Sequence, residues 1–126
     1  MKKCFAFLFS FLLVLAASIA PASAGDGSIT SYRAYIGEKD LYASDGLRLK
    51  TPRDVLRQDR ANYHKYGITQ EGDTDDGYFT TPGRRERFEN IPVRCSERVA
   101  AAIVEGGSTF GVTVYEDHIE VEFARR

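Results

Sequence analysis

The spacing of apolar residues predicts one helix more clearly than any other element. Between Pro52 and Tyr66, apolar side chains recur on one side of a helix that turns about 100° per residue; they are Val55, Leu56, Tyr63 and Tyr66. Thr51 suits the N-cap, Pro52 the first helical position and Gly67 the stop. We therefore expect a helix over residues 52–66, with the rest of the domain packed around its apolar side.

Alternation of apolar and polar residues predicts three strands. Residues 29–36 alternate along their whole length, and residues 109–115 and 119–123 do the same on either side of a turn at residues 116–118. The last two segments have the pattern of a β-hairpin. In each strand one face is apolar enough to cover a helix.

Shorter signals complete the expected fold. A helix is predicted over residues 97–105, a shorter one from Pro82 to about Glu89, and a tight turn at residues 44–46. The polar, acidic stretch at residues 68–77 is interpreted as a surface loop. The predicted class is α+β, with a small antiparallel sheet, made of the N-terminal strand and the C-terminal hairpin, packed against two or three helices.

The N-terminal segment differs in composition from the rest and predicts export. A basic start precedes an apolar run over residues 5–20, and residues 22–24 give the small-x-small pattern of a cleavage site. A retained anchor is the alternative, but the run is short for a span of about 20 residues. We expect residues 1–24 to be a cleaved secretory signal peptide. Residues 25–126 should form a single small globular domain, periplasmic or secreted, with no membrane span after cleavage.

The charge balance excludes a general attraction to polyanions. The chain has 17 basic and 18 acidic residues, and without Lys2 and Lys3 the basic residues fall to 15, which gives a formal charge of −3. Specific nucleic acid binding is therefore not implied, nor is bulk attraction to anionic membranes. Any recognition of anions has to come from a local arrangement of basic residues.

One such arrangement lies on a second face of the long predicted helix, about 120° from its apolar side. Its members are spaced at i, i+4, i+7 and i+11: Arg53, Arg57, Arg60 and His64. Like charges at these spacings destabilise a helix unless acids or a bound anion offset them. One interpretation is that the face is solvated and neutralised by nearby loops. The other is that it recognises anions, and its partner would then be an anionic envelope component or an acidic protein.

Asp59 falls in the middle of the apolar side of the same helix. A buried, unpaired carboxylate is too costly to keep, so the side chain should meet an arginine or backbone N–H groups, or stay protonated. Arg33 and Arg48 are the candidate partners. We expect a structural ion pair, and a catalytic carboxylate with a raised pKa is the alternative.

Cys95 is the only cysteine outside the predicted signal peptide, which contains Cys4. Three uses of a lone thiol in an oxidising compartment remain open. Cys95 can be a small buried hydrophobe, the bridge of a disulfide-linked dimer, or a reactive thiol whose pKa is depressed by Arg94 and by a helix N-terminus.

No strong catalytic or metal-binding motif occurs in the sequence. Glycine-rich phosphate loops, paired cysteines, Gly-x-Ser-x-Gly and His-Glu-x-x-His are absent, and the acids of residues 68–77 do not fit a calcium loop. We predict no metal and no cofactor. The favoured function is a binding or structural module of the cell envelope. The alternative is a small secreted hydrolase of nuclease or phosphodiesterase type, with His64 and His118 as acid and base and Asp59 as a further candidate.

Overall fold

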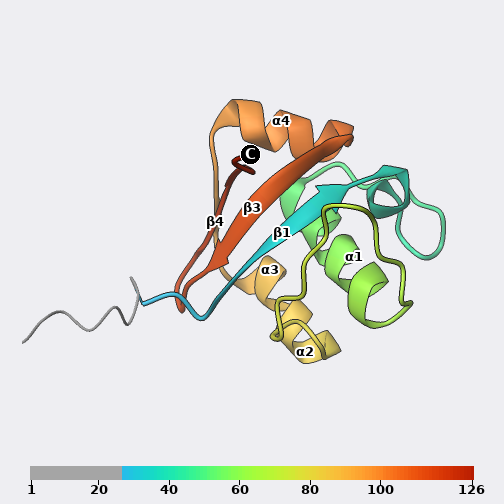
Figure 1. Ribbon diagram of the computed structural model, residues 1–126. Coiled ribbons are helices and arrows are strands. Elements are labelled where there is room, and N and C mark those ends of the chain that lie inside the picture. Colours follow the sequence, from blue (N-terminus) through green and yellow to red (C-terminus); the bar gives the residue numbers. More distant parts are fainter. Residues whose placement is uncertain (1–26) are drawn as a thin grey trace, which may run out of the picture.

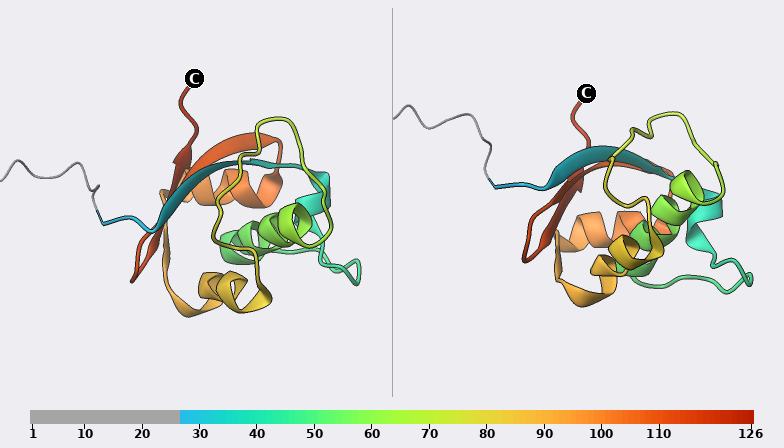
Figure 2. Two further views of the ribbon diagram at one scale, coloured as in Figure 1. Left: turned by 60° about the horizontal axis from the view of Figure 1, so that its bottom comes forward. Right: turned by 90° about the horizontal axis from the view of Figure 1, so that it is seen from below.

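The computed structural model describes residues 27–126, and the predicted signal peptide at residues 1–24 lies outside the described residues. In the described part, a four-stranded sheet has helices packed against one of its faces (Figures 1 and 2). The predicted α+β class is confirmed. Within residues 27–126, no helix has the length and apolar character needed to cross a membrane.

The strands of the sheet are β1 (Thr30–Ile36), β2 (Val93–Arg94), β3 (Ser108–Val114) and β4 (Ile119–Phe123). They lie in the order β1-β3-β4-β2. β1 and β4 both pair antiparallel with β3, as expected for an N-terminal strand beside a C-terminal hairpin, whereas β2 runs parallel to β4. β2 was not predicted, because two residues are too few to show a period, and it makes the sheet mixed.

The helices are η1 (Glu38–Leu41, a 3-10 helix), α1 (Pro52–His64), α2 (Pro82–Arg85), α3 (Arg87–Asn90) and α4 (Glu97–Glu105). In Figure 2, α1 and α4 lie beneath the sheet. The bounds of α4 agree with the prediction. The short helix predicted from Pro82 to about Glu89 is instead two short helices, α2 and α3, on either side of Glu86.

The ends of α1 show how local sequence sets this helix. Thr51 Oγ1 accepts a hydrogen bond from the N–H of Asp54 at 3.3 Å, which satisfies one of the unpaired donors of the first turn. Gly67 has the left-handed φ of +64° that stops the chain. The helix ends earlier than predicted, with Lys65 as C-cap. Tyr66 therefore leaves the apolar side and is 45% exposed, which corrects its predicted burial.

The hydrophobic core lies between the inner face of the sheet, α1 and α4. Its buried residues are Tyr32, Ala34, Ile36, Leu41, Val55, Leu56, Phe79, Phe88, Val99, Ile103, Phe110, Val112, Val114, Ile119 and Val121. Alternate residues from Tyr32 to Ile36 in β1 and from Phe110 to Val114 in β3 are among them, so the predicted alternation is confirmed. Phe123 was expected on the buried face but is 37% exposed, because it is the last residue of β4, although its ring stacks on that of Phe110.

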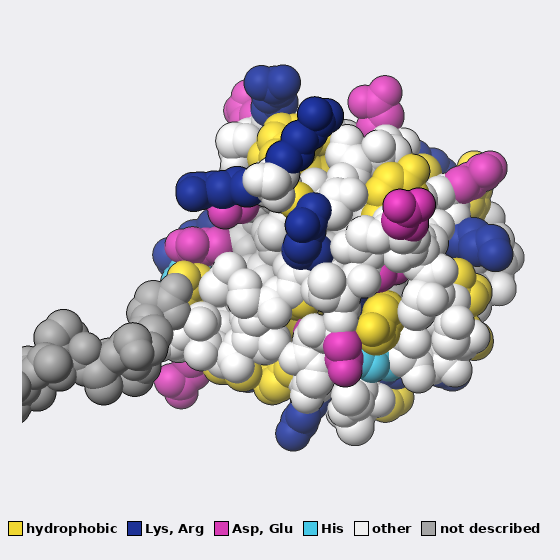
Figure 3. Space-filling view, viewed as in Figure 1, with side chains coloured by type: hydrophobic (Ala, Val, Ile, Leu, Met, Phe, Trp, Pro, Cys, Tyr) yellow, Lys and Arg dark blue, Asp and Glu magenta, His cyan; other side chains and the backbone are white. Residues whose placement is uncertain are grey.

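The outer face of the sheet is polar, and no helix among residues 27–126 covers it (Figures 2 and 3). Its residues come from alternate positions of three strands: Ser31, Arg33, Tyr35, Thr109, Gly111, Thr113, Glu120 and Glu122. An antiparallel pair with one face on the core and one toward solvent has this composition.

Candidate functional site

A cluster of charged side chains is buried between α1 and the loop at residues 68–81. We call Asp59, Arg60, His64, Asp73 and Asp76 the Arg60 cluster. Arg60 is fully buried; its Nε donates to Asp59 Oδ2 at 2.7 Å and its Nη1 to Asp76 Oδ1 at 2.9 Å. Its Nη2 lies 3.9 Å from Asp73 Oδ1. One guanidinium therefore faces three carboxyl groups that belong to two segments of the chain.

Two tyrosine rings contact the guanidinium of Arg60. Its Cζ atom lies 4.2 Å from the ring centroid of Tyr32 and 4.6 Å from that of Tyr63. Cation–π contacts are stronger where water is excluded, at about 2 kcal/mol or more. The planar guanidinium can combine such contacts with in-plane hydrogen bonds, which an ammonium group cannot do in the same way.

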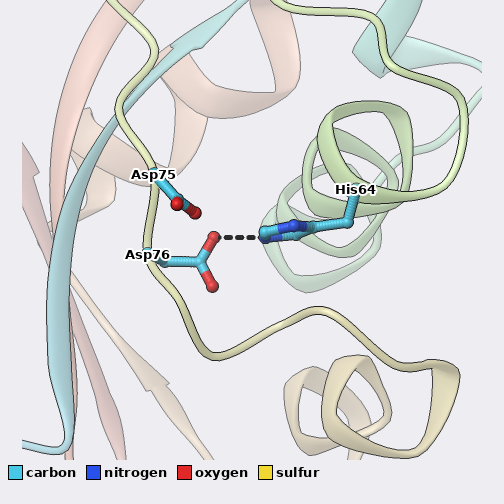
Figure 4. Close-up of side chains that lie close together, drawn as sticks. All are labelled: His64, Asp75 and Asp76. Atoms are coloured by element: carbon cyan, nitrogen blue, oxygen red, sulfur yellow. Dashed lines mark hydrogen bonds and ion pairs between the residues drawn. The ribbon is translucent and has the colours of Figure 1, made fainter.

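Asp76 accepts hydrogen bonds on both carboxylate oxygens. Oδ1 accepts from Arg60 and lies 2.6 Å from Nε2 of His64 (Figure 4), while Oδ2 accepts from the N–H groups of Tyr78 and Phe79 at 2.8 and 2.5 Å. Burial would raise the pKa of Asp76, but the N–H of Phe79, His64 and Arg60 together hold that pKa below its ordinary value. Asp76 is therefore an ionised anchor that ties the loop to α1.

The loop at residues 68–81 also covers the outer edge of β1 (Figure 1). Asp73 Oδ1 accepts a hydrogen bond from the N–H of Tyr35 at 2.8 Å, and Thr74 exchanges hydrogen bonds with the backbone of Arg33. Edge strands commonly need such protection against pairing with other chains. The loop follows from the polar composition of residues 68–77, but the inward orientation of its acids does not. The nearby apolar pair Tyr78–Phe79 was the available signal.

The predicted partners of Asp59 were wrong. Arg33 is exposed on the outer face of the sheet, and Arg48 donates to three backbone carbonyl groups, whereas the adjacent Arg60 pairs with Asp59. Asp59 and Arg60 are neighbours in sequence, so their positions on the helix differ by about 100°. The long side chain of Arg60 nevertheless turns back along the helix surface and reaches Asp59. Burial raises the pKa of Asp59 to about 8, although the charge of Arg60 opposes this shift.

The four basic residues predicted to share an exposed face do not do so. Arg60 is buried in its cluster, and the side chain of His64 is only 9% exposed and pairs with an acid. Arg53 and Arg57 remain at the surface, where both meet Glu89: Arg57 forms an ion pair with its carboxylate, and Arg53 Nη1 donates to its backbone oxygen at 3.3 Å. Only these two residues of the predicted anion-recognising face are accessible.

His64 and His118 each contact different acids. His64 is bonded to Asp76, whereas His118 lies between Asp117 and Glu120, with nitrogen-to-oxygen distances of 2.6 and 3.1 Å. No hydrogen bond or ion pair joins these two groups within residues 27–126. The hydrolase alternative, which needs both histidines beside a common pocket, stays a prediction.

Among the described residues, one group has ligand atoms close enough together for a metal ion. Atoms of His64, Asp75 and Asp76 lie within 4.8 Å of one another (Figure 4). Both oxygens of Asp76 are already occupied by hydrogen-bond donors, and the guanidinium of Arg60 adds a positive charge beside them. This donor set does not fit a metal ion.

Cys95 is partly buried against the core, just before the Ser96 N-cap of α4. Burial raises the pKa of its thiol, which contradicts the depressed pKa that the reactive alternative requires. The Ser96 side chain accepts the N–H of Val99, so one donor of the helix N-terminus is already used. A disulfide-linked dimer through Cys95 stays a prediction.

Several surface hollows among the described residues have charged or polar linings, and three of them bear on the predicted sites. The first, of about 590 Å³, lies at the β2 side of the outer sheet face and is lined by Arg94, Cys95, Thr113, Tyr115, Glu120, Val121 and Glu122. The second, of similar volume, is lined by Tyr35, Glu71, Gly72 and Thr109. A third, of about 230 Å³, includes Arg57 and Glu89. Asp59 and His64 line none of the three.

No family model, curated protein or solved structure matches the chain. Function is therefore inferred from the geometry of residues 27–126. In that geometry the Arg60 cluster is committed to holding α1, β1 and the loop together. Accessible charged groups include the two arginines beside Glu89 and, on the outer face of the sheet, Arg33, Glu120 and Glu122.

Proposed function

We propose that the protein is an exported binding or structural module of the cell envelope, which recognises anions through Arg53 and Arg57 of α1. The observation that supports this proposal is that both arginines stay at the surface and converge on Glu89. Export rests on the predicted signal peptide at residues 1–24. The partner is an anionic component of the envelope.

The contact between Arg57 and Glu89 is suited to exchange with an external anion. Their side chains are 34% and 48% exposed, and surface ion pairs are worth at most about 1 kcal/mol. A phosphate or carboxylate can therefore replace Glu89 at little cost, and the guanidinium can bind it through two parallel hydrogen bonds. The hollow of about 230 Å³ beside this pair leaves room for the incoming group.

Binding to vesicles that contain phosphatidylglycerol in phosphatidylcholine tests the proposal. The R53A/R57A variant should bind about ten-fold more weakly or worse, and wild-type binding should weaken as NaCl rises from about 0.05 to about 0.5 M. E89Q should bind more tightly, because it removes the competing carboxylate. R125Q/R126Q removes the same number of charges from the exposed C-terminal end and should bind as the wild type does.

Two results would count against this assignment. Equal losses in R53A/R57A and R125Q/R126Q would show a diffuse charge effect and no local site. Unchanged binding in E89Q would show that Glu89 does not compete with the anion. Binding to polyglutamate in place of vesicles would assign an acidic protein as the partner instead of a lipid.

A further inference from the structure

A short hairpin projects from the body of the domain between η1 and α1 (Figure 2). It covers residues 42–48: Tyr42 pairs with Arg48, and the N–H of Ala43 donates to the carbonyl oxygen of Leu47 at 2.8 Å. Gly46 supplies the positive φ of +87° at the turn. Residues 44–47, which form the turn, are all exposed. The hairpin therefore has a defined shape and presents its turn to the surroundings.

Exposed apolar side chains gather on and beside this hairpin. Leu47 is 66% exposed, the highest value among the exposed large hydrophobic side chains of residues 27–126. Tyr42, which is 42% exposed, lines a hollow of about 460 Å³ together with Tyr66. A single exposed apolar residue is ordinary, but three in one region indicate an interaction surface.

Basic side chains accompany this apolar surface. Lys65 Nζ lies 5.2 Å from the ring centroid of Tyr66. Ala43 lines the hollow that contains Arg57, and Leu47 stands opposite Ala43 in the hairpin, so their side chains share a face. The apolar turn therefore lies on the same side of the hairpin as an arginine that we propose to recognise anions.

We propose that the hairpin inserts Leu47 into the interfacial layer of an anionic phospholipid bilayer, while Arg53 and Arg57 bind the lipid headgroups. This inference rests on the proposed function and names a lipid surface as its partner. A tyrosine has an apolar ring and a polar hydroxyl group, which suits the boundary between headgroups and acyl chains. Tyr42 and Tyr66 occupy this boundary when Leu47 is inserted.

Two weak contributions act together at such a surface. Burial of one leucine does not hold a domain on a bilayer, and a weak apolar anchor becomes stable only with a second signal such as a basic patch. Leu47 and the arginines of α1 supply these two signals. Asp45 is the only acid among residues 42–48, and its Oδ1 accepts the N–H of Leu47 at 3.0 Å. Its charge stays in water, so insertion is limited to the headgroup layer.

A single tryptophan tests the insertion, because the sequence contains none. With vesicles that contain phosphatidylglycerol in phosphatidylcholine, the emission of Leu47→Trp should shift to the blue and be quenched by brominated acyl chains, since the indole leaves water. Ile29→Trp places the same reporter at a 44% exposed position, at the opposite end of β1 from the hairpin. It should bind the same vesicles with no shift and no quenching.

Removal of the apolar group tests its contribution to binding. Leu47→Ser should bind these vesicles about ten-fold more weakly. High NaCl should abolish the remaining binding, because only charge then holds the protein to the vesicle. Ile29→Ser removes an exposed apolar side chain far from the hairpin and should bind as the wild type does. Neither substitution should change the melting temperature, because both side chains are exposed.

The outcomes separate this inference from the proposed function. Vesicle binding that needs Arg53 and Arg57 but leaves the emission of Leu47→Trp unshifted would overturn the insertion and keep the anion site. Absence of vesicle binding by the wild type would overturn both. A blue shift of Leu47→Trp that grows with protein concentration in the absence of lipid would also overturn the insertion, by assigning the hairpin to a contact between copies of this chain.

Discussion

At the scale of single residues, Asp59 and Arg60 show how a pair of sequence neighbours can control the response to pH. The pKa of Asp59 is about 8 in the fold because of burial, against about 3.9 in an unfolded chain. Between these values the folded protein holds a proton that the unfolded chain releases. The contribution of this proton to stability is complete below about pH 4 and is lost as the pH rises toward 8.

Asp59→Asn should remove this part of the pH dependence. Asparagine keeps an oxygen that can accept from Arg60 Nε, but it has no proton to take up on folding. We expect the urea midpoint of the variant to vary less than that of the wild type between about pH 5 and pH 8. Relative to the wild-type midpoint, the midpoint of the variant should be higher near pH 8 than near pH 5. A wild-type midpoint that rises steadily with pH across this range would contradict the assignment.

At the scale of elements, local signals were sufficient for some parts of the fold and not for others. The starts of α1 and α4 follow from Thr51 and Ser96, which both accept backbone hydrogen bonds, and these signals need no knowledge of the rest of the chain. The inward turn of Asp73 and Asp76 depends on where β1 and Arg60 lie. No local pattern encodes that, so the acidic loop was predicted without its role.

The position of Arg60 illustrates the same limit for the candidate site. Helical spacing correctly put it on the same stripe as Arg53 and Arg57, but spacing describes Cβ directions and not the path of a long side chain. The loop brings carboxylates to Arg60 from residues more than a dozen positions away. The predicted four-residue face was therefore reduced to two accessible arginines.

Asp76→Asn tests the connection between α1 and the loop. Removing the ionised partner leaves the buried Arg60 with excess positive charge, and breaking such a pair costs about 3–5 kcal/mol of unfolding free energy. The lowered pKa of Asp76 means that its contribution is present above about pH 4 and is lost below it. Asp75→Asn, at the exposed neighbouring acid, should change the free energy of unfolding by no more than about 1 kcal/mol. Equal effects of the two variants in urea unfolding at neutral pH would be evidence against the connection.

At the scale of the whole molecule, the fold leaves one face of the sheet open but closes one of its edges. The helices lie on the inner face, the outer face is polar, and the loop at residues 68–81 runs along the edge of β1 (Figures 1 and 2). An uncovered edge would present unpaired backbone groups to other chains. The edge of β1 is therefore protected by a segment that belongs to neither the sheet nor the helices.

Asp73→Ala should expose this edge and promote self-association. The variant loses the acceptor for the N–H of Tyr35, so the loop can detach from β1 and leave the strand free to pair. Sedimentation velocity over a range of protein concentrations should show larger species than in the wild type. Glu71→Ala, at an exposed acid in the same loop, should sediment like the wild type. Identical behaviour of both variants would show that the loop does not protect the edge.

β1 has two kinds of backbone amide. Along one edge its N–H groups donate to side chains of the loop, and along the other edge they face β3. The N–H groups of Arg33 and Tyr35 are held by Thr74 Oγ1 and Asp73 Oδ1, while the alternate amides face β3. Deuterium uptake at the first kind requires only detachment of the loop, whereas uptake at the second requires separation of paired strands. Adjacent residues of one strand thus report the free energies of two different openings.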